Sequence, residues 1–180
     1  MFEKFLEFFN EDLKIESSKD VYGTFVSMLG GKMFGNGLFC SFSQSNINKW
    51  NEIVTRAYPD FAQKFKVFGH DWLGRCFGID LRDETFENVL MFEIGINDVL
   101  EIPCKLEDFL NEEIPVYSDA CLAKSFFHSW LNQSQEKLEY GRCVGYKVPL
   151  FLGGNDDIDN LENSDMEVYW EILTQVKNSL

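Results

Sequence analysis

The order of hydrophobic and polar residues predicts helices at the two ends of the chain and strands between them. Residues 2–13 repeat apolar side chains at helical spacing with glutamates between them, which predicts an amphipathic helix. Ser17 or Ser18 would cap a second helix, which the glycine pair at 30–31 would end. A third helix is expected over residues 45–58, capped by its first serine.

The middle of the chain has the pattern of short strands. After a turn at residues 35–37, apolar residues alternate along a strand over 38–43. Four more segments are rich in β-forming residues and bounded by turns, namely residues 65–69, 75–81, 89–93 and 99–102. Because the links between these segments are short, we expect them to form an antiparallel meander.

Helical patterns return after Pro103. A short helix is expected over residues 106–113, and a longer one would begin at Ser118 and reach Trp130. The final helix would open at Ser164 with a capping box, in which the serine accepts a hydrogen bond from the backbone of the third helical residue.

That last helix carries an apolar stripe of Val168, Ile172 and Val176, with Tyr169, Trp170 and Leu173 beside it. Together the elements predict an α+β fold, with the antiparallel meander in the middle, helices packed mainly on one of its faces and helices at both termini. We expect a single domain over residues 1–180, with the sheet in residues 1–110 and a helical part in residues 111–180.

Composition narrows the class of protein. Eighteen phenylalanines predict a large aromatic core. The five cysteines are odd in number, widely spaced and without a CxxC pair, so we expect buried free thiols rather than disulfides or a zinc site. No apolar run has the length of a membrane helix, and acidic residues interrupt the N-terminal apolar stretch, so we expect a protein that stays in the cytoplasm.

The net charge of −14 argues against nucleic-acid binding, since phosphate backbones would be repelled. The charge is uneven: residues 80–119 hold twelve acidic and two basic residues, and residues 151–180 hold seven acidic and one basic. Such an acidic surface serves either solubility or the attraction of a basic partner.

Candidate catalytic residues are few. His70 and Asp71 share an expected turn, and Cys40, Cys76 or Cys143 could partner the histidine, but no nucleophile elbow or cysteine-protease signature accompanies them. The glycine pairs match no phosphate-binding loop. We therefore expect no enzyme, and keep an unknown activity of His70 and Asp71 as the alternative.

The acidic loop over residues 155–160 is the strongest metal candidate. Aligning Asn155, Asp157 and Asp159 with the first ligands of an EF-hand puts Asn160 where glycine is required and Met166 where the bidentate glutamate belongs. The expectation is therefore no metal and no cofactor, with an adventitious cation left open.

Two stretches resemble a known bacterial family. They are residues 68–80, FGHDWLGRCFGID, and residues 145–154, GYKVPLFLGG, the latter followed by Asn160-Leu161-Glu162 and the start of the last helix. The chain from about Val21 resembles type VI secretion immunity proteins with a GAD-like N-terminal part, whose toxin partners include DNases. A weaker pattern is similar to the SUKH superfamily. His70 and the turn at residues 95–97 depart from the family's usual residues.

The resemblance implies an immunity protein that binds and neutralises a cognate secreted toxin, a nuclease being one class, by occluding its active site or substrate cleft. A scaffold that binds some other protein is a further alternative. The partner-binding residues we predict are, first, Asp156, Asp157, Asp159 and Glu162, and second, Asp71 and Trp72. For both stretches a structural role is the competing interpretation: a core-capping turn at residues 71–75, and an extended segment buried beneath the last helix at residues 147–154.

Overall fold

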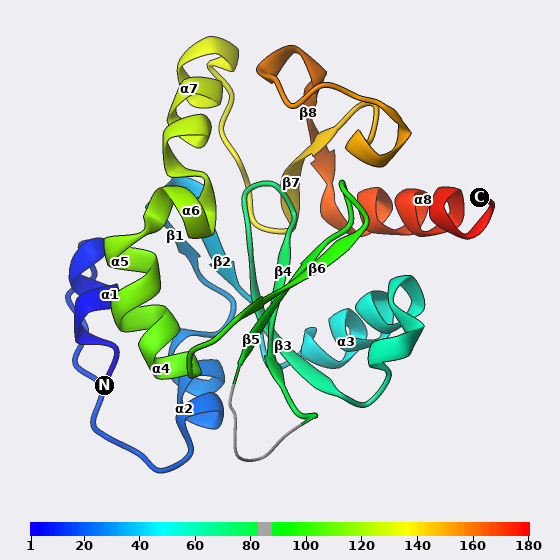
Figure 1. The fold of residues 1–180 in the computed structure, drawn as a ribbon. Helices are drawn as coiled ribbons and strands as arrows, with labels where there is room; N and C mark the ends of the chain where they lie inside the picture. The colour runs from blue at the N-terminus through cyan, green and yellow to red at the C-terminus, as the bar shows by residue number, and fades with distance from the viewer. Residues whose placement is uncertain (83–87) are drawn as a thin grey trace.

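A computed structural model describes residues 1–82 and 88–180 (Figure 1). Its centre is a six-stranded antiparallel sheet in sequential order. The strands are β1 (Met33–Phe34), β2 (Phe39–Ser41), β3 (Phe65–Asp71), β4 (Cys76–Asp80), β5 (Val89–Glu93) and β6 (Asp98–Ile102). The predicted four-stranded meander is confirmed as β3–β6. Two further strands extend it: β2, which was expected as a strand outside the meander, and the short β1, which the sequence pattern did not predict.

A second, two-stranded antiparallel sheet pairs β7 (Arg142–Tyr146) with β8 (Leu161–Asp165). The helices are α1 (Glu3–Phe8), α2 (Val21–Leu29), α3 (Ile47–Ala57), α4 (Leu106–Asp108), α5 (Ile114–Val116), α6 (Ser118–Leu122), α7 (Lys124–Ser134) and α8 (Met166–Asn178). A π-helical turn over Phe109–Glu113 joins α4 to α5. None of the helices in the described part of the chain is long and apolar enough to cross a membrane.

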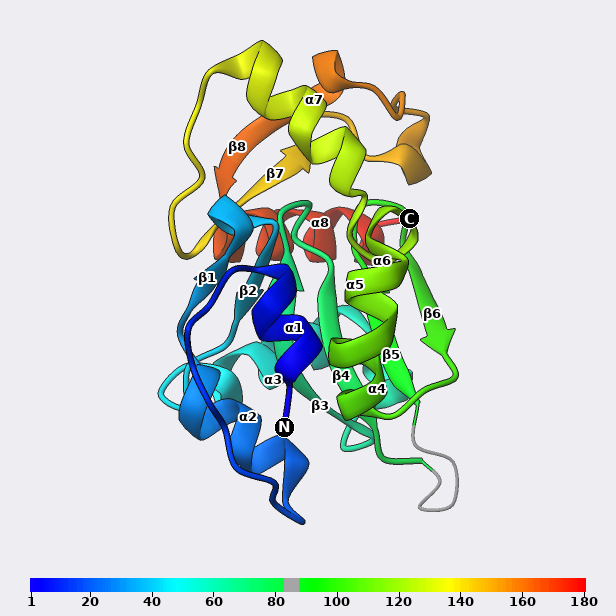
Figure 2. The same cartoon turned by 90° about the vertical axis from the view of Figure 1, so that its left-hand side faces the viewer.

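The first face of the sheet is covered by α1, α2 and the α4–α6 segment, and α7 lies beyond the end of the sheet, near β7 and β8 (Figure 2). Strand residues alternate between the two faces, so Phe68 and Phe77 point to this side, where Phe109 packs edge-on or tilted against both. The N-terminal helix adds Phe5, whose ring lies 4.9 Å from that of Phe34. The expected aromatic core is confirmed here.

The opposite face is covered by α3 and α8 (Figure 1). Trp50 of α3 meets Trp170 of α8 edge-on, with ring centroids 6.3 Å apart, over sheet residues that include Leu90 and Phe92. Most helices thus lie on one face, as expected, but the second face carries a core of its own. The C-terminal region contributes to both, since α4–α6 lie on one side and α8 on the other.

Several helix boundaries differ from the sequence prediction. Asp20, not Ser17 or Ser18, caps α2 by accepting from the Gly23 amide. Asn46 rather than Ser45 precedes α3, and it makes no side-chain cap. Carboxylates and backbone geometry here outcompete the serines that lie one to three residues earlier.

The C-terminal helices also differ in detail. The long helix expected from Ser118 is broken at Ala123, which adopts a left-handed backbone with φ +50°. Asp165, not Ser164, caps α8 through the Val168 amide at 3.0 Å. The expected stripe was wrong: Val168 and Ile172 are more than half exposed, because Tyr169, Trp170 and Leu173 form the buried side.

Candidate partner-binding surface

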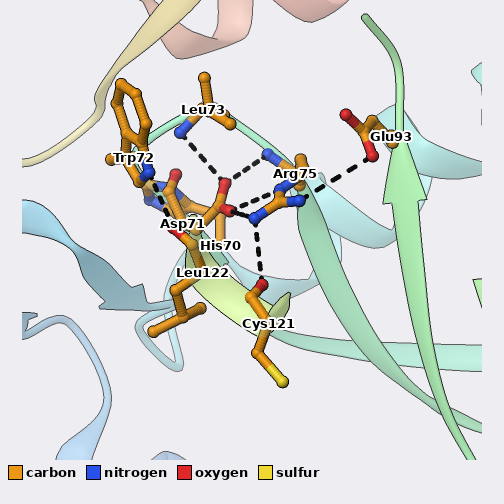
Figure 3. Close-up of polar contacts among 8 residues, drawn as sticks. All are labelled: His70, Asp71, Trp72, Leu73, Arg75, Glu93, Cys121 and Leu122. Carbon is orange, nitrogen blue, oxygen red and sulfur yellow. Dashed lines mark hydrogen bonds and ion pairs between the residues drawn. The ribbon is translucent and has the colours of Figure 1, made fainter. Parts of the chain in front are cut away.

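The turn between β3 and β4 is held by a single buried carboxylate (Figure 3). Asp71 Oδ1 accepts hydrogen bonds from the backbone amides of Leu73, at 3.1 Å, and Arg75, at 3.0 Å. Gly74 has φ +77°, a left-handed conformation that residues with a Cβ rarely adopt. The sequence Asp-Trp-Leu-Gly-Arg therefore encodes the shape of the turn itself.

Arg75 extends this network to neighbouring elements. Its Nε donates to Asp71 Oδ2 at 2.6 Å, and one terminal nitrogen donates to the Cys121 carbonyl on α6 at 3.0 Å. The other terminal nitrogen lies 4.0 Å from the Glu93 carboxylate at the end of β5. Burial raises the pKa of Glu93, while the nearby guanidinium of Arg75 opposes that shift.

Trp72 belongs to the same structural unit. Its indole Nε1 donates to the Leu122 carbonyl at 2.8 Å, and its rings pack against Phe127 and Trp130. Asp71 and Trp72 are both completely buried. The structure therefore corrects our second set of partner residues: in this fold their side chains contact only the chain itself, and the structural interpretation of the turn is confirmed.

His70 is also inside. It is 2% exposed, and its Nδ1 lies 3.0 Å from the Asp71 carbonyl. Burial lowers its pKa to about 4, and the backbone contact opposes this shift. Across the sheet His70 pairs with Cys40 and Cys76, and burial raises the pKa of the Cys40 thiol to about 12. A protonated thiol and an enclosed imidazole offer no accessible nucleophile and base.

The two recognisable sequence stretches meet at this turn. The Val144 amide of β7 donates to the Trp72 carbonyl at 2.6 Å, and Trp170 Nε1 of α8 donates to the Gly74 carbonyl at 2.8 Å. A Cβ at position 74 would lie 3.0 Å from the Cys143 sulfur. The turn is thus the point at which the β7–β8 sheet and α8 attach to the central sheet.

Residues 147–160, which we call the β7–β8 loop, project from that attachment (Figure 1). The expectation of a buried segment here was wrong, because Val148 is 48% exposed and Leu152 is 45% exposed. The apolar sequence suggested burial, and the pattern gave no sign that a hairpin connection would carry these side chains into solvent.

The β7–β8 loop is nonetheless internally bonded. Asn160 Oδ1 accepts from the Val148 amide at 2.9 Å, and its Nδ2 donates to the carbonyls of Val148 and Asn155, both at 2.8 Å. Gly154 approaches the Val148 carbonyl too closely to leave room for a Cβ. One asparagine therefore holds the two ends of the loop together, so the loop presents a surface of defined shape.

The first set of predicted partner residues lies on or beside this loop, and all four are exposed. Asp157 Oδ1 accepts from the Asn160 amide at 3.0 Å, Asp156 accepts from the Tyr146 hydroxyl at 2.7 Å, and Asp159 accepts from Gln133 at 3.2 Å. Glu162 lies on β8. Within the described residues none of the four takes part in an ion pair, so their negative charge is not neutralised by the chain.

A shallow depression of about 430 Å³ opens on this surface, lined by Val148, Gly153, Gly154, Asn155, Asp157, Asp159 and Asn160. Each carboxylate in it is directed to a different hydrogen-bond donor. Among residues 1–82 and 88–180, no three His, Cys, Asp or Glu side chains converge on a point that could hold a metal ion. The geometry suits contact with a protein better than ligation of a cation.

Comparison with known proteins bears on this region. Residues 107–177 match the model of the family described as T6SS immunity protein Tdi1, C-terminal. This match supports a type VI secretion immunity family for the C-terminal part of the chain. The match spans α5–α7, the β7–β8 sheet with its loop and most of α8. The family implies an immunity protein and suggests a non-enzymatic role, and the GAD-like N-terminal part stays a prediction.

The other comparisons concern the fold. A structure described as "Crystal structure of Atu4351 from Agrobacterium tumefaciens" is similar over 97% of this chain and 89% of its own, with a TM-score of 0.65 and 19% sequence identity. At that identity the likeness shows a shared fold, which includes the N-terminal sheet that the family model does not cover. No curated protein matches the chain.

Proposed function

We propose that this immunity protein binds a cognate secreted toxin through the β7–β8 loop and neutralises it by covering its active site or substrate cleft. The observation that carries the proposal is the loop itself. It lies within the family match, it is fixed by Asn160, and it exposes carboxylates that form no ion pair with any residue the structure describes. Val148 and Leu152 add exposed apolar area beside those charges, the usual composition of an interface core with a polar rim.

A nuclease is the toxin class that this surface fits best. Enzymes that act on nucleic acids present positive clefts to phosphate backbones, and an acidic surface on a chain of net charge −14 would be drawn to such a cleft. Electrostatic steering accelerates association, which suits a protein that has to capture a toxin in the cytoplasm before the toxin meets its substrate.

The test uses the toxin encoded by the neighbouring gene. Asp159 and Glu162 are the cleanest positions for charge reversal, because Asp156 and Asp157 also support the loop through Tyr146 and Asn160. The double variant Asp159→Lys, Glu162→Lys is expected to weaken toxin binding by about tenfold or more at low salt, mainly through a slower association rate, with a smaller difference in high salt.

A matched control reverses two exposed acids far from the loop, Glu7→Lys and Asp12→Lys. It changes the net charge by the same amount and should alter association much less. Equal effects from the two double variants would mean that only the net charge of the chain matters, and not the position of the loop. Unchanged binding of the loop variant at low salt would show that the loop is not part of the interface.

A further inference from the structure

The two edges of the central sheet differ. Strand β1 has only two residues, too few to pair along its outer side with another chain. Strand β6 has five, it ends the strand order, and three of its residues are exposed, whereas every described residue of β5 beside it is buried. In Figure 2 β6 stands at the margin of the molecule with no helix or strand beyond it.

The outward-facing backbone groups of β6 can be assigned. The Val99 amide donates to Asp98 Oδ1 at 2.8 Å, so it is not directed at β5. In an antiparallel ladder the pairs alternate, so the N–H and C=O groups of Val99 and Glu101 point away from β5, and those of Leu100 point toward it. The Val99 amide is satisfied by its own neighbour, and no described residue pairs with the Glu101 amide.

The edge lacks several of the usual protections against pairing. It carries no proline, lysine or bulge, and Leu100 leaves 43% of its surface exposed. Its charged residues, Asp98 and Glu101, are both acidic, and Glu101 forms an ion pair with Arg82, so among the described residues Asp98 carries the unpaired negative charge of this strand. A second copy of this chain would bring another net charge of −14 to the edge, so self-pairing is opposed, while a positively charged strand is attracted.

We propose that the outer edge of β6 receives an extended, basic segment of the toxin, which adds a seventh strand to the sheet. The proposal rests on the proposed function for the identity of the partner and adds a second contact, separate from the β7–β8 loop. Backbone hydrogen bonds supply affinity in this mode, and side chains beside Leu100 and Glu101 supply selectivity.

Amide hydrogen exchange of the complex tests this directly. The Glu101 amide should exchange rapidly in the free protein and become protected when the toxin is bound. A saturated complex in which the Glu101 amide still exchanges rapidly would overturn the β6 proposal while leaving the proposed function intact. Protection of Glu101 without toxin at high protein concentration would assign the edge to a second copy instead. If no complex with the toxin forms at all, both the β6 proposal and the proposed function are wrong.

Two variants separate backbone pairing from charge. Glu101→Pro removes the outward amide without removing a bond to β5, a position at which edge strands tolerate proline, and should weaken toxin binding by about tenfold. Glu101→Gln keeps the amide but, like Glu101→Pro, removes the charge and the ion pair with Arg82, so its effect should be clearly smaller. Thermal unfolding of both variants verifies the fold, and equal affinities of the two would contradict strand addition.

Discussion

Arg75 and Asp71 form an ion pair inside the protein, with Nε 2.6 Å from Oδ2 and both side chains almost completely enclosed. Charged groups without solvent are stable only when every partner is in place. Here the partners come from the turn, from α6 and from the end of β5, so one side chain joins three segments that are distant in sequence.

Replacing Arg75 by methionine should destabilise the protein strongly. The Asp71 carboxylate would keep its place without its cationic partner, and breaking a buried pair in this way costs about 3–5 kcal/mol. Denaturant unfolding followed by fluorescence measures the loss. Arg56→Met is the matched control, since it breaks the exposed pair with Glu171 and should cost no more than about 1 kcal/mol. A loss at Arg75 as small as that of the control would show that Asp71 is satisfied without it.

His70 should make stability depend on pH. Its pKa is about 4 in the folded protein against an ordinary value of 6.5, so the unfolded chain binds the proton more readily. Above pH 6.5 both states are neutral and the contribution is constant. As the pH falls from 6.5 toward 4, protonation of the unfolded chain lowers the free energy of unfolding, by about 2–3 kcal/mol at pH 4.5.

The variant His70→Gln isolates this effect. It cannot titrate at that position, so its free energy of unfolding should fall less than that of the original chain between pH 7.5 and 4.5. Carboxylates with raised pKa, such as Glu93, act in the opposite direction but are common to both proteins and cancel in the comparison. Parallel stability curves over this range would show that His70 is protonated without cost in the folded state.

Asn160→Ala should weaken binding without weakening the core. The change removes three hydrogen bonds that close the β7–β8 loop, so toxin binding would have to supply the ordering of the loop, and affinity should fall about tenfold. Amides in residues 147–160 should exchange faster, while the free energy of unfolding changes by about 1 kcal/mol or less. Asn48→Ala, at an exposed position on α3, is the control and should leave the toxin affinity and the amide exchange of the loop unchanged. Unaltered affinity with faster exchange would mean that the toxin does not use the loop's fixed shape.

Much of the fold could be predicted from local patterns, because alternation and turn residues specify the four long strands directly. The other features of the fold depend on which of several apolar side chains is buried, and the sequence alone does not decide this. In α8 two apolar stripes share one helix, and the pair Tyr169 and Trp170 is buried in place of Val168 because larger aromatic area is removed from water. The break at Ala123 has no glycine or asparagine to announce it.

The candidate surface was predicted only in part. Acidic composition located Asp156, Asp157 and Asp159, but it could not show that Asn160 holds them in one shape, since that depends on contacts across twelve residues. The same limit applied to Asp71 and Trp72. Tryptophan and aspartate are equally common in binding epitopes and in buried turns, and burial was the information that decided between them.

The attachment of α8 to α3 also sets an order in time. Lys177 Nζ donates to the Ala57 carbonyl across 120 residues of sequence, and Trp50 is covered only when Trp170 arrives. During synthesis α3 can pack on the sheet first, but the part of Trp50 that faces Trp170 is covered only after α8 has been made. Over that interval one side of the second core stays open to solvent, which exposes the nascent protein to aggregation and proteolysis.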